Sequence, residues 1–188
     1  KLSHEIESFA TSTGVLVAWV KFPVLSNTAD VQFWMYYGNA GAASQEDAAN
    51  VWDDNYLGVW HMANAATAST TDSTAYGHHG TTLGASAYTA GKVGAALDFN
   101  GSNSRVRVES SPVINSASTT MTVSGWVNAD TVGENSLGHI FYGPNWRLYI
   151  EEMEMLTFLD TRWTATDGMW STEMGSLMPG STWYYLSV

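Results

Sequence analysis

Hydrophobic and polar residues alternate in short runs along most of the chain, and clusters of Gly, Asn, Ser and Thr separate the runs. Neighbouring side chains of a β-strand point to opposite faces, so alternation predicts a strand with one buried side. Arg105–Glu109 is the clearest case, because Val106 and Val108 share one face and the charged residues between them share the other. We therefore expect an all-β protein whose short strands form a two-layer sandwich.

The first part of the chain predicts only a few strands. Val15–Lys21 and Val31–Tyr37 have the composition of strands, and Ala42–Trp52 is the best candidate for a short helix or polar turn. Two or three strands are rarely stable alone, so we expect residues 1–50 to be the C-terminal part of a larger β domain. The tryptophans within apolar runs are expected in the core; these are Trp19, Trp34 and Trp60.

Residues 51–188 are expected to form a second domain. Its strand candidates begin at Leu57–Met62 and continue, separated by turn residues, to Trp183–Val188. A phosphate-binding glycine loop follows a strand and begins a helix. The glycines of Gly91–Gly101 do neither, so we interpret them as turn glycines.

Composition narrows the function. The net charge is -11, from 18 acidic and 7 basic residues. Phosphate backbones repel such a surface, so nucleic acid and anionic membranes are poor partners. The absence of cysteine excludes disulfides, zinc–thiolate sites and cysteine nucleophiles. No stretch of about 18 apolar residues exists, so we expect no membrane insertion.

Six motifs in the second domain resemble the bacterial LamG-like jelly-roll family. The most specific is GKVGAALDFNG, and the others are Val59–His61, Asp72-Ser73, Gly77–Thr81, Thr122–Val127 and Thr182–Tyr184. The resemblance covers about residues 52–188 and implies a concanavalin A-like jelly roll. Such domains continue for several strands beyond the T-W-Y phrase. We therefore expect a sandwich that is truncated at its C-terminus.

The N-terminal segment also resembles a known family. His4–Phe9 (HEIESF), Leu16–Pro23 (LVAWVKFP) and Tyr36–Ser44 (YYGNAGAAS) are similar to the end of an uncharacterised domain family. Those domains often precede LamG-like modules in large bacterial and archaeal surface proteins. This resemblance implies a secreted or cell-surface bacterial protein.

Aromatic residues are the first candidates for ligand contact, since the chain holds nine Trp and nine Tyr. Sugars stack flat C–H faces on such rings, and Trp and Tyr add a polar group. The candidates lie in or beside Gly-, Asn- and Thr-rich stretches: Tyr142, Trp146, Trp163 and Trp170. The alternative is that these rings pack the interior.

Two carboxylates are the candidates for catalysis. On a strand, Glu152 and Glu154 would share a face with their Cα atoms about 6.6–6.8 Å apart. Retaining glycosidases hold their carboxylates about 5–5.5 Å apart. Jelly-roll glycosidases use an E-x-D-x-E type of motif, and its central Asp is missing here. The alternative is a solvated strand edge.

A structural calcium ion is the expected cofactor, because sandwiches of this clan often bind one through carboxylates and backbone carbonyls. Calcium prefers oxygen ligands, which this acidic chain supplies. Asp72 and Asp98 are the candidate ligands, and Asn100 is a further one. The alternative is that Asp72 caps a turn and Asp98 makes a loop hydrogen bond. A transition-metal site is less favoured, because His78 and His79 are adjacent and would point to opposite faces of a strand.

Together these features favour a non-catalytic carbohydrate-binding or adhesion module, with a polysaccharide or cell-surface glycan as its partner. A glycoside hydrolase or polysaccharide lyase is one alternative, and a structural spacer is the other. This hypothesis rests partly on a resemblance of fold, which is an analogy, because one fold can host many functions.

Overall fold

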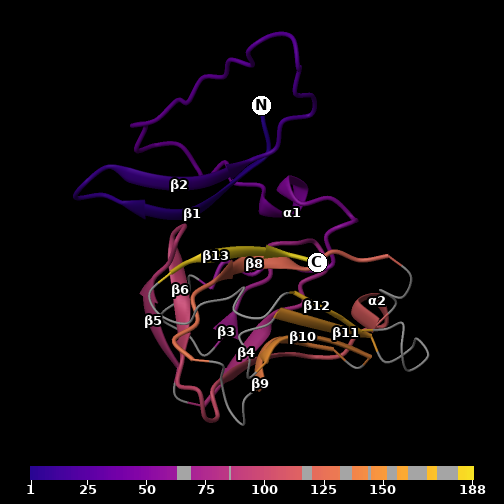
Figure 1. Ribbon diagram of the computed structural model, residues 1–188. Coiled ribbons are helices and arrows are strands. Elements are labelled where there is room, and N and C mark those ends of the chain that lie inside the picture. Colours follow the sequence, from indigo (N-terminus) through magenta and orange to yellow (C-terminus); the bar gives the residue numbers. More distant parts are fainter. Residues whose placement is uncertain are drawn as a thin grey trace. The chain divides into compact units, whose positions relative to one another are not determined.

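The computed structural model describes residues 1–62, 69–84, 86–115, 120–131, 137–143, 145–151, 156–160, 169–172 and 182–188. Strands make up nearly all of their regular structure (Figure 1). The helices among them are α1 (Ala48–Val51) and α2 (Pro112–Asn115), each of four residues. The expectation of an all-β protein is confirmed.

The strands form five small sheets in the described part of the chain. β1 pairs with β2, β4 lies between β3 and β7, β5 pairs with β6, β8 pairs with β13, and the fifth sheet has the order β12-β11-β10-β9. The strands are β1 (His4–Ala10), β2 (Val15–Val20), β3 (Ser69–Thr70), β4 (Gly80–Leu83), β5 (Ser86–Ala90), β6 (Ala95–Phe99), β7 (Arg105–Val108), β8 (Ser124–Val127), β9 (Leu137–Tyr142), β10 (Trp146–Glu151), β11 (Leu156–Asp160), β12 (Met169–Ser171) and β13 (Tyr184–Ser187).

Contacts divide the chain into two compact units. The first unit holds Lys1–Thr82, Tyr88–Leu97 and Val106–Glu109. The second unit holds the remaining ranges, Leu83–Ala87, Asp98–Arg105 and Ser110–Val188.

The first unit begins with an antiparallel hairpin. β1 and β2 pair from His4 opposite Val20 to Ala10 opposite Val15, and Gly14 occupies the left-handed region in the turn (φ +72°). The register shifts between Ile6 and Ser8, so Glu7 has no residue directly opposite on β2. A bulge of this kind changes the direction of a side chain.

The expected strand Val31–Tyr37 is not a strand in the structure. It follows β2 as part of a long loop and forms no ladder with any described residue (Figure 1). Trp34 within it is 80% exposed, so the prediction that this residue lies in the core is wrong. β2 pairs instead with the nearer segment β1. Trp19 and Trp60 are half-buried.

The second unit contains a core between two sheets. Ile150 of β10 and Leu186 of β13 are buried side by side, and residues of both sheets pack around them. Leu148, also on β10, is only 1% exposed. Sheet-on-sheet packing of this kind is how a β-sandwich builds its interior.

Within the described residues, no helix has both the length and the apolar character needed to cross a membrane.

Candidate functional site

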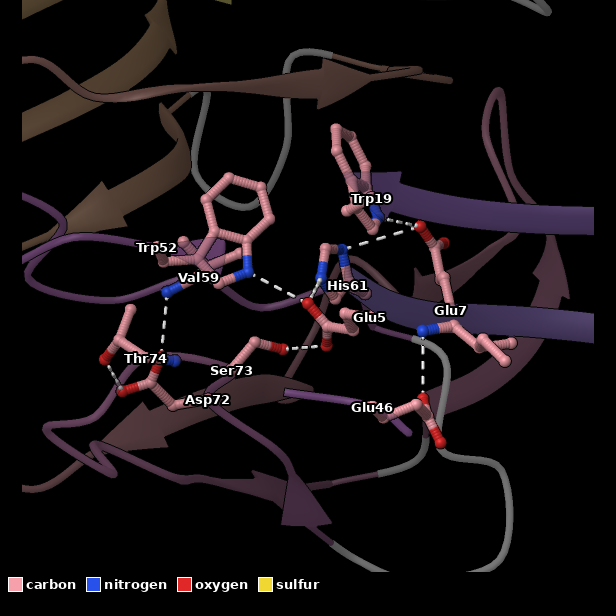
Figure 2. A network of polar contacts seen from close by, with 11 residues as sticks. Glu5, Glu7, Trp19, Glu46, Trp52, Val59, His61, Asp72, Ser73 and Thr74 are labelled. Carbon is pink, nitrogen blue, oxygen red and sulfur yellow. Dashed lines mark hydrogen bonds and ion pairs between the residues drawn. The ribbon is translucent and has the colours of Figure 1, made fainter. Parts of the chain in front are cut away.

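The first unit holds a partly buried polar and aromatic network around one histidine (Figure 2). We call it the Glu5–His61 cluster, and its members are Glu5, Glu7, Trp19, Trp52, His61 and Ser73. The β1–β2 hairpin supplies the first three of these residues, and the segment that follows α1 supplies the others. The cluster thus fastens the hairpin to residues 52–73.

His61 lies between two carboxylates. Its Nε2 is 3.2 Å from Glu5 Oε2, and its Nδ1 is 3.5 Å from Glu7 Oε2. The Glu7 side chain is only 2% exposed. The imidazole also stacks on the indole of Trp19, with ring centroids 5.3 Å apart and planes inclined by 22°. A hydrogen bond to Glu5 and ring stacking on Trp19 therefore hold this side chain in place.

The two carboxylates collect the remaining donors of the cluster. Trp19 Nε1 donates to Glu7 Oε2 at 2.7 Å, and Trp52 Nε1 donates to Glu5 Oε2 at 2.9 Å. Ser73 donates its hydroxyl to the other oxygen of Glu5. Hydrogen bonds to ionised groups are roughly twice as strong as neutral ones, so this network is a strong structural element.

The same geometry limits the chemistry of the cluster. A hydroxyl nucleophile needs a neighbouring base that can take its proton. Ser73 bonds to Glu5 rather than to His61, and both ring nitrogens of His61 already face carboxylates. An open pocket of about 290 Å³ lies beside the cluster, and its lining includes Ile6 and Met62. The arrangement stabilises packing and offers no assembled nucleophile.

Asp72, a predicted calcium ligand, is 4% exposed, and its carboxylate accepts several hydrogen bonds. Its Oδ1 accepts from the backbone N–H groups of Val59 at 2.9 Å and Thr74 at 3.0 Å. Its Oδ2 accepts from the Thr74 hydroxyl and the His78 backbone N–H, both at 2.8 Å. These four donors satisfy both oxygens and give Asp72 a structural role of its own.

The other candidate ligands lie elsewhere. Asp98 is exposed on β6, and the side-chain oxygen of Asn100 accepts backbone N–H groups from residues 102–104 of its own loop. Among the described residues, no group of three or more His, Asp or Glu side chains could hold a metal ion. Calcium binding stays a prediction.

Tyr142, at the end of β9, belongs to a patch of the second unit that is exposed at Tyr142 and His139 and buried at Tyr149. We call it the Tyr142 patch, and it contains Tyr142, His139, Arg147 and Tyr149. The Tyr142 ring is 67% exposed, and the Arg147 guanidinium lies over it, 5.2 Å from its centroid. The His139 ring centroid is 5.4 Å from that of Tyr142 and 5.5 Å from that of Tyr149. A cation above an aromatic face is attracted by the ring quadrupole.

Two pKa values in the Tyr142 patch depart from their ordinary range. Burial lowers the pKa of His139 and the Arg147 charge lowers it further, so the imidazole is neutral at pH 7. Burial raises the pKa of Tyr149 and the Glu151 charge raises it further, while Arg147 opposes this. The patch therefore presents a cation and neutral hydrogen-bonding groups.

Trp146 lies apart from the Tyr142 patch. It precedes Arg147 on β10, so the two side chains point to opposite faces of the sheet. Its ring is 6.5 Å from that of Phe141, and it lies so close to Gly143 that a Cβ there would be 2.7 Å from the indole. Trp146 therefore packs within its own hairpin.

The remaining predicted site residues fall outside the description. Trp163, Glu152 and Glu154 are not among the described residues. Trp170 is placed only by its backbone, opposite Phe158 in the β11–β12 ladder.

Sequence reasoning missed the Glu5–His61 cluster. The available signal was the spacing of Glu5 and Glu7, two residues apart in an alternating run with Ile6 between them. That pattern predicts two carboxylates near one face of a strand. Nothing local indicated that His61, more than fifty residues later, would fit between them.

Comparison with known proteins gives one match. Residues 1–74 match a family described as a domain of unknown function, DUF2341. No curated protein matches the chain, and no solved structure matches it. All six members of the Glu5–His61 cluster, and also Asp72, lie within the matched range. Over its first 74 residues the chain is thus similar to an uncharacterised domain, as its N-terminal phrases indicated.

Proposed function

We propose that the protein is a non-catalytic carbohydrate-binding module that contacts a glycan through the Tyr142 patch. The observation that carries this proposal is the Tyr142 ring, which is 67% exposed with Arg147 directly above it. A flat ring beside polar groups suits a sugar, whose C–H face stacks while its hydroxyls take hydrogen bonds.

The groups around Tyr142 support this proposal. Arg147 makes no ion pair with an acidic residue in the described part of the chain, and a guanidinium supplies hydrogen-bond donors of the kind that sugar hydroxyls accept. A neutral His139 offers one donor and one acceptor, which matches the dual character of a sugar hydroxyl. The core between the β8–β13 sheet and the β10 sheet is compatible with a concanavalin A-like, LamG-like sandwich, which belongs to the same proposal. We also propose a secreted or cell-surface location in a bacterium.

The test is isothermal titration of the protein with a panel of soluble polysaccharides, with and without calcium. We expect at least one polysaccharide to bind, and Tyr142→Ala to weaken that binding about tenfold, equivalent to about 1.4 kcal/mol. Tyr185→Ala is the matched control, because Tyr185 is 59% exposed on β13 and also contacts a second ring. Loss of binding in both variants, or binding of nothing in the panel, would contradict the proposal.

A spacer role is the second candidate, and the Glu5–His61 cluster is the observation that favours it. Buried carboxylates hold the β1–β2 hairpin firmly against residues 52–73, as a module built to transmit force or fix a distance would require. Failure of every glycan to bind, together with an intact fold, would favour this role. Substitution of Glu152 and Glu154 by Gln tests the hydrolase alternative, because hydrolysis that survives both changes excludes that pair.

A further inference from the structure

The long loop after β2 carries the most exposed aromatic side chains of the described residues. Tyr36 is 93% exposed, Tyr37 is 88% exposed and Trp34 is 80% exposed. We call these three residues the Trp34 loop site. They belong to the first unit, whereas the Tyr142 patch belongs to the second, so the two aromatic surfaces are separate features of the chain. Contiguous exposed apolar surface of this kind marks an interaction site.

Hydrogen-bonded turns hold both ends of the loop that carries the site. Before it, the Ser26 hydroxyl accepts the backbone N–H of Thr28 at 3.1 Å. After it, Gly38 lies in the left-handed region (φ +82°), and Asn39 Oδ1 accepts the backbone N–H of Gly41 at 3.0 Å. A loop that is held in one conformation loses less entropy when it binds a ligand.

Phe33, the ring of this segment without a polar group, packs on a neighbour. Its centroid is 5.2 Å from that of Phe22, and the two planes are inclined by 73°, which is an edge-to-face contact. Phe33 is 55% exposed, well below the exposure of Trp34, Tyr36 and Tyr37. The most open rings are therefore those with an N–H or O–H group at the edge. Their ligand should offer an apolar face together with hydrogen-bonding groups.

Charge at the Trp34 loop site favours a neutral ligand. Residues 31–37 include no charged side chain, and the chain as a whole carries -11. An acidic ligand would be repelled by the chain and would find no cation in this segment. A neutral ligand is subject to neither effect.

The area of the three rings is too small for a typical protein partner. An aromatic side chain buries roughly 150–250 Å², so three rings offer at most about 450–750 Å². A stable protein–protein interface takes about 800 Å² from each partner. An oligosaccharide stacks its sugar units on individual rings, so it can use the whole of this smaller area.

We propose that Trp34, Tyr36 and Tyr37 form a second carbohydrate-binding site, selective for a neutral polysaccharide. The C–H faces of the sugar stack on the rings, and its hydroxyls exchange hydrogen bonds with the indole N–H and the phenol O–H groups. This site rests on the proposed function for its class of ligand and extends that function to the first unit. It does not depend on the Tyr142 patch.

An NMR titration of isotope-labelled protein with neutral oligosaccharides tests this site directly. The probes are cellohexaose, xylohexaose and mannohexaose, and the readout is the indole N–H resonance of Trp34, identified by its absence in Trp34→Phe. We expect at least one probe to shift this resonance saturably. Tyr36→Ala should weaken that binding about tenfold. Val24→Ala is the matched control and should leave it unchanged, because Val24 is an aliphatic residue of the same loop and is 74% exposed.

The outcomes distinguish this site from the Tyr142 patch. A Trp34 shift that persists in Tyr142→Ala supports the second site, and a shift that disappears in Tyr142→Ala overturns it. Binding of a probe that leaves the Trp34 resonance unmoved overturns the second site but not the proposed function, whereas no binding of any probe contradicts both. Equal losses in Tyr36→Ala and Val24→Ala, or a response to phosphatidylcholine vesicles instead of sugars, would also overturn the assignment.

Discussion

His61 is the residue on which the packing of the first unit most depends. Its ring separates two carboxylates whose side chains are 12% and 2% exposed, and each ring nitrogen faces one of them. Removing a hydrogen-bond partner from a buried polar group costs about 1–3 kcal/mol. The structural importance of this histidine therefore exceeds that of an ordinary half-buried side chain.

His61→Ala should lower the free energy of unfolding by about 1–3 kcal/mol, because Glu5 would lose a hydrogen-bond partner and the ring that separates it from Glu7 would be gone. Chemical denaturation followed by Trp fluorescence measures the change. His79→Ala is the control, since His79 is exposed and its ring makes one hydrogen bond, to the backbone N–H of Asp72. A loss no larger than that of the control would contradict the role assigned to His61.

Tyr149 should make stability depend on alkaline pH. Its pKa is raised in the folded protein, so above pH 10 the unfolded chain loses the phenolic proton first. The unfolded state then binds fewer protons than the folded state, and stability falls as the pH rises from about 10 to the folded pKa. Tyr149→Phe should reduce this fall between pH 9 and pH 11, measured by urea denaturation. Tyr185→Phe, at an exposed position, should leave it unchanged.

At the scale of elements, the β3–β4–β7 sheet leaves little space for a side chain at one position of β4. Gly80 on β4 lies directly opposite Thr70 on β3, and a Cβ at this position would be only 2.4 Å from Val106 Cγ1. The Val106 side chain is β-branched and stiff, so it cannot turn aside easily. The β3–β4–β7 sheet therefore requires glycine at this position.

Gly80→Ala should destabilise the protein by about 1–3 kcal/mol through overpacking against Val106. Gly125→Ala on β8 is a matched control, since a Cβ there would meet nothing within 4 Å. We expect the control to be neutral or slightly stabilising, because alanine restricts the unfolded chain. Thermal unfolding of both variants gives the comparison, and equal effects would show that space at β4 is not limiting.

Element by element, the sequence was a good guide where a run alternates and has a nearby partner. Arg105–Val108 is β7 as expected, with its valines half-buried and its arginines exposed. The run Val31–Tyr37 alternates less strictly and remains unpaired. The run His4–Ala10 was not predicted, because its glutamates conceal the apolar pattern, yet it pairs with β2 through a short turn. Short loops close at a lower entropy cost than long ones, which favours this hairpin.

At the scale of the whole molecule, the net charge produces repulsion between copies of the chain. A net charge of -11 on 188 residues produces repulsion between copies that reaches about 30 Å at 0.01 M salt and about 8 Å at 0.15 M. Repulsion of this range keeps copies of the chain apart when the salt concentration is low.

Repulsion between copies should therefore weaken as salt increases. Between 0.01 and 0.15 M sodium chloride, we expect the second virial coefficient of the protein to fall, because screening shortens the range of the repulsion. Static light scattering at the two salt concentrations measures this change. A coefficient that does not fall would contradict the role given to the net charge.

The alternation of residues was enough to determine that this protein is built from short β-strands, because side-chain direction on a strand is a local property of the chain. The acidic composition likewise disfavours phosphate-bearing partners, and the absence of cysteine excludes disulfides within the chain. Tertiary structure decided which strands pair, that Asp72 is a buried hub and that His61 lies between Glu5 and Glu7. These are contacts between residues distant in sequence. Their energies depend on how deeply the side chains are buried and how closely they approach, and neither can be read from one segment of the chain.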